Sequence, residues 1–251
     1  MWKLRELYPA KKAPRKRCGV RELKSGLSTS DLVEQMLSGD RRALSRLFTL
    51  LERDKQSREK VMRYVFPYYK GAYVIGITGP PGAGKSTLVN ELLSMIRRGD
   101  ETVGMLAFDP SSPFNMGGVL GDRIRLQNHF LDKEVYIRSF GARGTQGGLS
   151  GVASAAVRLL DAFGKRFILV ETVGVGQTEL DILGVADSII VVLVPEAGDE
   201  VQMMKAGLME IADIFVVNKS DRPGASRLAN SIRNEVNPHE GSRQGERSVL
   251  L

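Results

Sequence analysis

The sequence predicts an α/β fold in which a mostly parallel sheet carries helices on both faces and follows a small N-terminal helical region. Three observations predict it. Short apolar, β-branched runs alternate with stretches of helical periodicity over residues 71–236, as in chains that build parallel sheets. Residues 189–194 are apolar without alternation, which is typical of a strand buried on both faces. Residues 28–70, in contrast, show helical patterns alone.

Composition excludes several classes of protein. A chain of 251 residues with 42% hydrophobic residues is of ordinary globular composition, and no apolar run reaches the length of a membrane span. Cys18 is the single cysteine, so an internal disulfide is excluded and a reducing compartment is expected: the cytoplasm, or the mitochondrial matrix of a eukaryote. With His129 and His239 as the only histidines, there is little material for a thiolate or imidazole metal site.

The net charge of +7 belongs to the N-terminal tail. Residues 1–25 contain nine Lys or Arg and two Asp or Glu, so the rest of the chain is balanced. We interpret residues 1–27 as a basic flexible tail. A transit peptide, a nuclear signal or a nucleic-acid patch is the alternative for this segment. Because positive and negative charges are balanced in the rest of the chain, we expect neither a nucleic acid nor a membrane as a partner.

Residues 28–70 are expected to form two or three helices. Ser30 is a candidate N-cap for a first helix, an apolar stripe from Leu44 to Leu51 marks a second, and a third leads to Pro67. These helices either cover the sheet or form an arm that binds a partner.

A complete phosphate-binding loop follows. Gly79, Gly84, Lys85 and Ser86 match G-x-x-x-x-G-K-[ST] between an apolar run and a helical pattern, which predicts the P-loop NTPase fold. Glycines let backbone N–H groups converge on an anion, Lys85 would neutralise phosphate charge, and the Ser86 hydroxyl would bind Mg²⁺. The alternative is a tight turn without a ligand. The expected phosphate-binding residues are Gly79, Gly82, Ala83, Gly84, Lys85, Ser86 and Thr87.

Three acidic residues are candidates for binding the metal or orienting the attacking water. Asp109 ends the second apolar run, and Asp122 follows a glycine-rich stretch, residues 115–121, that resembles a switch loop. Glu171 ends the apolar run 167–170, and Gly174 comes three residues later, where its N–H could approach the γ-phosphate. The predicted metal ligands are Ser86, Asp109, Asp122 and Glu171, and the predicted catalytic residues are Lys85, Asp109, Asp122 and Glu171. Turn, capping and strand-end positions are the alternative for these acids.

A guanine-reading element comes after the run 214–217. Asn218, Lys219 and Asp221 form N-K-x-D, in which Asp221 would accept from the N–H groups of guanine. Adenine offers no donors there, so a buried carboxylate would be left unpaired at a cost of about 1–3 kcal/mol. The predicted ligands are therefore GTP or GDP with Mg²⁺.

With these motifs placed, the chain resembles the MeaB/ArgK family of GTPases, which includes the methylmalonic aciduria type A protein. The stretches that carry the resemblance are residues 76–87 (GITGPPGAGKST), 109–112 (DPSS), 121–123 (GDR), 170–177 (VETVGVGQ) and 218–221 (NKSD). Most GTPases have Asp at the position of Glu171. The resemblance implies a GTP-hydrolysing chaperone for an adenosylcobalamin-dependent acyl-CoA mutase, especially methylmalonyl-CoA mutase. It also implies that residues 195–205 form a switch between nucleotide and mutase.

The chain departs from the family pattern at its C-terminal end. Family members continue into a Ser-Ala loop that contacts guanine and then into helices that form a homodimer. Here residues 237–251 are expected to be an irregular tail, with the start of the next strand at residues 248–251, as in a fragment or a truncated product.

The sequence leaves two other functions open. A kinase that passes phosphate to a transport protein or a small molecule is one of them, although the guanine element argues against it. A nucleotide-binding module that regulates a partner without turnover is the other.

Overall fold

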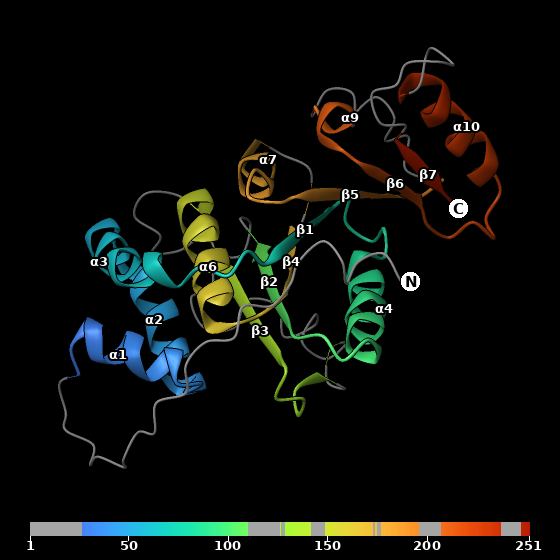
Figure 1. Ribbon diagram of the computed structural model, residues 1–251. Coiled ribbons are helices and arrows are strands. Elements are labelled where there is room, and N and C mark those ends of the chain that lie inside the picture. The colour runs from blue at the N-terminus through green and yellow to red at the C-terminus, as the bar shows by residue number, and fades with distance from the viewer. Residues whose placement is uncertain are drawn as a thin grey trace.

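The computed structural model describes residues 27–109, 126, 129–141, 149–172, 174, 177–195, 207–236 and 247–251 (Figure 1). Strands in this part of the chain form a seven-stranded sheet of order β3-β2-β4-β1-β5-β6-β7, with every neighbouring pair parallel. The strands are β1 (Tyr73–Thr78), β2 (Val103–Asp109), β3 (Val135–Gly141), β4 (Phe167–Thr172), β5 (Ser188–Leu193), β6 (Ile214–Val217) and β7 (Ser248–Leu250). The predicted α/β class with a parallel sheet is confirmed.

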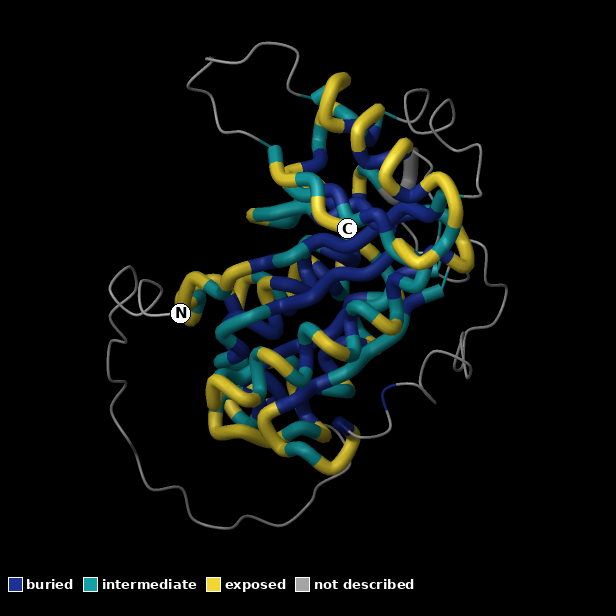
Figure 2. The backbone as a smooth tube through the Cα atoms, turned by 90° about the vertical axis from the view of Figure 1, so that its right-hand side faces the viewer, coloured by how far each residue is buried: buried dark blue, intermediate teal, exposed yellow. Residues whose placement is uncertain are grey.

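The sheet is buried on both faces, and its central strands form the dark interior of Figure 2. In β5, Ile190 and Val192 belong to one apolar cluster and Val191 and Leu193 to another, because successive side chains point to opposite faces. This explains why the run 189–194 is apolar without alternation.

Helices cover both faces of this sheet. Helix α4 (Lys85–Arg98) packs in the cluster that holds Ile190 and Val192. On the opposite face lie α6 (Leu149–Phe163), α7 (Gln177–Leu183), α9 (Leu208–Ile211) and α10 (Ala225–Val236). Two strand glycines let these helices come close: a Cβ on Gly76 would lie 2.8 Å from Leu183 Cδ2. On Gly104 it would lie 2.5 Å from Leu160 Cδ1.

The N-terminal helices pack on α6 and on β3. They are α1 (Thr29–Leu37), α2 (Arg41–Arg53), α3 (Lys55–Val65) and the 3₁₀ turn η1 (Phe66–Tyr68). The Phe48 ring of α2 stacks on Tyr136 of β3, with centroids 5.5 Å apart. Most of these helices' buried apolar residues share one cluster with α6, so they form a helical cover.

The predicted cap of the first helix was wrong. Ser28, and not Ser30, is the N-cap residue of α1: its hydroxyl accepts from Asp31 N at 3.2 Å, while the Asp31 carboxylate accepts from Ser28 N at 3.1 Å. This reciprocal pair is a capping box, which needs the acid three residues after the cap. Ser30 has no such partner, because position 33 is Val.

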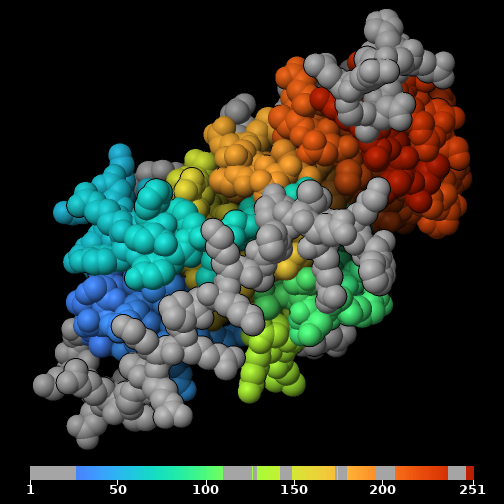
Figure 3. All heavy atoms as spheres, in the orientation of Figure 1, coloured from blue at the N-terminus to red at the C-terminus, as the bar shows by residue number. Residues whose placement is uncertain are grey.

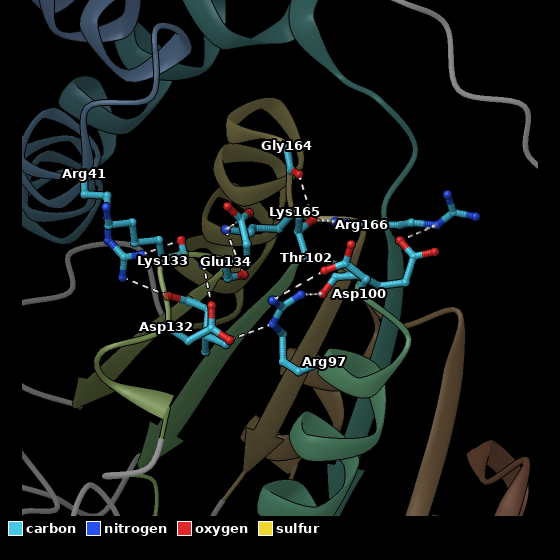
Figure 4. A network of polar contacts seen from close by, with 12 residues as sticks. Arg41, Arg97, Asp100, Thr102, Asp132, Lys133, Glu134, Gly164, Lys165 and Arg166 are labelled. Carbon is cyan, nitrogen blue, oxygen red and sulfur yellow. Dashed lines mark hydrogen bonds and ion pairs between the residues drawn. The ribbon is translucent and has the colours of Figure 1, made fainter.

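A polar network holds the N-terminal edge of the sheet together (Figure 4). Arg97, at the end of α4, donates to Asp132 in the turn before β3, with 2.7 Å between Nε and Oδ2. Lys165, before β4, donates to Glu134 O at 2.9 Å, and burial lowers the pKa of this lysine. Arg41 of α2 donates to Lys133 O at 2.8 Å. The network thus ties helices on both faces to the starts of β3 and β4.

Several predicted features lie outside the described residues. These are the basic tail except Leu27, the glycine-rich stretch 115–121, Asp122, most of the switch 195–205 and residues 237–246. At the C-terminal end, Ser248–Leu250 forms β7 beside β6. Among the described helices, none is long and apolar enough to cross a membrane.

Candidate nucleotide site

The predicted site residues that the structure describes gather at the C-terminal edge of the sheet. The loop 79–84 follows β1, Glu171 lies near the end of β4, Asp109 is the last residue of β2, and Asn218 follows β6 directly. Because the strands are parallel, these ends meet at one edge. After β1 the chain continues to β2, which lies on one side of β1 beyond β4. The later strand β5 lies on the other side of β1. Ligands bind in the crevice at such a switch point.

The loop depends on glycine at positions that a larger residue could not fill. Gly79 has φ of 142°, and a Cβ there would lie 2.0 Å from Val192 O of β5. Gly84, with φ of 91°, is the N-cap residue of α4, and a Cβ would lie 2.2 Å from Asn218 Nδ2. Gly84 provides no side-chain cap for α4, so an anion bound at this loop would meet the N-terminal end of the helix, as in phosphate-binding loops.

Lys85 is held over this loop. Its side chain is buried, and Nζ donates to Gly79 O at 2.8 Å and to Pro80 O at 2.9 Å. These carbonyls fix the ammonium at the centre of the loop, where a phosphate bound by the surrounding amides would meet it.

Ser86 and Glu171 meet although they are 85 positions apart. The Ser86 hydroxyl donates to Glu171 Oε1 at 2.9 Å, and Glu171 is only 4% exposed. Glu171 pairs in register with Ile77 of β1 and Ala107 of β2, so Asp109 lies two residues further along the neighbouring strand. Ser86 and Glu171 together offer a hydroxyl and a carboxylate, the oxygen donors that suit Mg²⁺.

The donor set fits magnesium better than a softer metal. In the described part of the chain, no group of three or more His, Cys, Asp or Glu side chains could hold a metal by itself. Magnesium is usually bound by one or two protein oxygens, with waters and phosphates completing its shell. The residues present therefore fit Mg²⁺ brought in with a nucleotide.

Two threonines join the phosphate loop to the segment after β4, and the sequence interpretation missed them. Thr172 Oγ1 donates to Thr78 Oγ1 at 3.0 Å, and Thr78 Oγ1 donates to Gly174 O at 2.9 Å. Gly174, with φ of 104°, also forms a bridge with Gly79. A threonine at the end of each of two strands was the available signal, but their contact depends on strands β1 and β4 being neighbours.

The predicted guanine-reading element lies against the same loop. Asn218 Nδ2 donates to Ala83 O at 2.8 Å, which ties the segment after β6 to the phosphate loop. Lys219 adopts φ of 56°, an uncommon conformation for a residue with a side chain, and Asp221 is exposed. Asp122 lies outside the described residues, so the structure does not place it with the other acids.

Comparison with known proteins identifies the family. Residues 44–248 match the family model described as "Methylmalonyl Co-A mutase-associated GTPase MeaB". A Pyrococcus abyssi protein named "Putative GTPase" is 53% identical over 195 residues, which cover 78% of this chain and 60% of that protein. The mouse protein "Methylmalonic aciduria type A homolog, mitochondrial" is 40% identical over 147 residues, 59% of this chain and 35% of its own length. The chain thus spans about three fifths of the archaeal relative.

The fold is also shared with a solved structure. The crystal structure of LAO/AO transport system kinase aligns with a TM-score of 0.70 and 24% identity, covering 91% of this chain and 70% of that one. At this identity the likeness shows the fold alone. Since the family model spans most of the chain, we conclude that the chain belongs to the MeaB family of methylmalonyl-CoA mutase-associated GTPases.

Proposed function

We propose that this protein binds GTP with Mg²⁺ at the C-terminal edge of its sheet and hydrolyses it. The observation that carries the proposal is the 2.9 Å hydrogen bond between Ser86 and Glu171, which brings the two expected magnesium ligands together beside the phosphate loop. The contact between Asn218 and Ala83 supports it from the other side, because it holds the base-reading segment against the same loop.

The roles of the residues follow from their places. Backbone amides of residues 82–87 bind the phosphates, and Thr87 reaches the α-phosphate. Lys85 offers its ammonium to the β- and γ-phosphates from its position over the loop. Gly174, whose carbonyl accepts from Thr78, would bring its N–H to the γ-phosphate. Asp221 accepts from guanine, while the Lys219 stem lies along the base.

Magnesium supplies charge neutralisation on the phosphate oxygens. Ser86 and Glu171 would hold it, and Asp109 and Asp122 would orient the attacking water. The assignment of Asp122 is carried by its place in the sequence. Because Glu171 is buried near the end of β4, its carboxylate keeps a constant position relative to the loop.

We propose further that GTP hydrolysis serves an adenosylcobalamin-dependent acyl-CoA mutase of the methylmalonyl-CoA mutase type, whose cofactor loading and protection it assists. The description of the matched family names association with that mutase, and the name of the mouse relative refers to methylmalonic aciduria.

The test is to measure binding of GTP, GDP and ATP with Mg²⁺, together with phosphate release. We expect GTP to bind at least about fivefold more tightly than ATP. Lys85→Ala should weaken GTP binding by about tenfold or more, from the loss of a charge-assisted contact. Lys60→Ala, on an exposed position of α3, is the matched control and should change nothing.

Equal binding of GTP and ATP would contradict the guanine assignment. Stable transfer of labelled phosphate to an acceptor, in place of its release, would favour a kinase.

The partner is tested with the purified mutase from the same genome. We expect this mutase to bind the protein in a manner that depends on the nucleotide. Failure to bind would contradict the chaperone role and leave the proposed GTP hydrolysis unaffected.

A further inference from the structure

A cavity of about 670 Å³ lies between α3, η1 and α6, and none of its lining residues belongs to the nucleotide site. Figure 3 shows the cyan atoms of α3 and η1 at the left of the molecule, next to the yellow atoms of α6. We call it the arginine cavity. The residues that define it are Arg58, Arg63, Arg158, Met62, Phe66 and Tyr69. Its volume lies in the usual range of ligand sites.

The arginine cavity carries an excess of positive charge. Its lining holds three arginines and one carboxylate, that of Glu59. Arg63 and Arg158 are exposed, and neither forms an ion pair with a carboxylate in the described part of the chain. Two cationic groups that face the same cavity would gain from an anion placed between them.

Two of the three guanidinium groups also pack against neighbouring residues. The Arg158 guanidinium lies over the Tyr69 ring, 5.4 Å from its centroid. Arg58 is only 8% exposed and occupies the space beside Gly151, where a Cβ would lie 3.4 Å from its Cζ atom. A guanidinium whose position is already set loses less entropy on binding, so the cavity is preorganised for an anion.

An exposed apolar surface adjoins these arginines. The Phe66 side chain is 67% exposed, although its ring packs edge-on against Tyr69 at 5.4 Å. Met62 of α3, four residues before Phe66, also lines the cavity. Arginine, aromatic residues and methionine are the types enriched at the cores of protein–protein interfaces.

We propose that the arginine cavity is the docking site for an acidic segment of a partner protein. A carboxylate of that segment pairs with Arg63 and Arg158, and a neighbouring apolar side chain packs on Met62, Phe66 and Tyr69. A protein segment fits better than a small anion, because the exposed Phe66 ring extends the apolar surface. It fits better than a nucleic acid, because the cations gather in one place instead of along a groove.

The experiment uses the full chain and fluorescein-labelled peptides. The probe is Glu-Asp-Phe-Glu-Leu-Asp, and the two comparison peptides replace either its acidic residues by Lys or its Phe and Leu by Ser. We expect the probe to bind at least about tenfold more tightly than either comparison peptide, since charge and apolar contact both contribute. Arg63→Glu and Arg158→Glu should each weaken binding by about tenfold or more. Arg227→Glu, a charge reversal at an exposed position of α10, is the matched control and should leave it unchanged.

Equal loss of binding in Arg227→Glu would overturn the proposal, because the attraction would then be one of general charge. Tight binding of the lysine peptide, or of a single-stranded RNA oligonucleotide through Arg63 and Arg158, would also overturn it. Thermal unfolding followed by circular dichroism checks that each variant is folded, without reference to nucleotide binding. Phe66→Ser, at an exposed position, is the second variant: it should weaken the probe without affecting the serine peptide, and an unchanged probe affinity would count against the site.

Discussion

At the scale of single residues, two glycines of the phosphate loop are needed for different reasons. Gly79 combines φ of 142° with direct contact to the backbone of β5, where a Cβ would meet Val192 O at 2.0 Å. Gly82 has φ of 77° but open space around it, with no atom within 4 Å of a Cβ. The first position excludes a side chain by contact and conformation, the second by conformation alone.

We therefore expect Gly79→Ala to destabilise the protein far more than Gly82→Ala. An alanine at positive φ costs about 1–2 kcal/mol at either position. Only at position 79 must the backbone of β1 and β5 also move apart, and that should add at least about 2 kcal/mol. Urea unfolding of both variants measures the difference. Similar free energies of unfolding would show that the approach of Gly79 to Val192 costs little to relax.

A second prediction at this scale concerns Asp221. In Asp221→Asn the side chain gains an amide donor, so it should donate to the 2-oxo group of xanthine and lose its fit to guanine. We expect GTP binding to weaken by about five- to a hundredfold, and xanthosine triphosphate to become the preferred nucleotide. Competition between the two nucleotides is the measurement. Retained GTP preference would refute the role assigned to this exposed carboxylate.

At the scale of elements, the pair Arg97–Asp132 joins the end of α4 to the turn before β3 (Figure 4). The hydrogen bond from Arg97 is the main cause that holds the pKa of Asp132 below its ordinary value of 3.8. Because the folded-state pKa is lowered, the pair contributes stability above this value, and that contribution is lost as the pH falls through the folded-state pKa. Arg97 also contacts Asp100, at 3.9 Å, but that side chain is fully exposed.

We expect Asp132→Asn to lower the free energy of unfolding at pH 7 by about 1–2 kcal/mol, the range for a charged hydrogen bond that is partly exposed. The difference from wild type should shrink below about pH 4, where acid protonates Asp132. Asp100→Asn is the matched control, since Asn tolerates the positive φ of 58° at this position, and it should change stability by less than about 0.5 kcal/mol. Urea unfolding at both pH values tests this. A difference that persists at low pH would mean that charge is not involved.

At the scale of the whole molecule, the proposed ligand would connect two halves of the sheet. Its phosphates and magnesium would contact residues after β1 and β4, and its base would contact the segment after β6. Strands β4 and β1 are neighbours, and β5 lies between β1 and β6 in the sheet. A ligand that binds only when all these ends are aligned stabilises the folded state as a unit.

GTP with Mg²⁺ should accordingly raise the free energy of unfolding by about 2.7 kcal/mol at a ligand concentration of one hundred times the Kd. Removal of the metal with EDTA should abolish most of this gain. In Ser86→Ala the gain should become nearly independent of Mg²⁺, whereas Ser94→Ala, about two turns further along the same helix, should behave as wild type. Thermal unfolding with and without chelator is the measurement. A gain that EDTA does not reduce would contradict the metal assignment.

Some features of this protein were predictable because they depend on near neighbours in the chain. The phosphate loop, the strand-end acids Asp109 and Glu171 and the NKSD element each lie within a short segment whose periodicity also predicts its strand or helix. The cap of α1 was missed by two residues, because serines at 28 and 30 both precede an apolar stripe and only the acid at 31 distinguishes them.

Contacts between distant segments needed the fold. Ser86 meets Glu171 across 85 positions and Asn218 meets Ala83 across 135, while Thr78 joins Thr172 only because β1 and β4 are adjacent. The sequence alone determined the α/β class, the nucleotide-binding loop and the family, since local patterns carry that information. The tertiary structure alone decided which of these groups touch, and where the arginine cavity forms, because strand order and helix packing depend on the burial of the whole core.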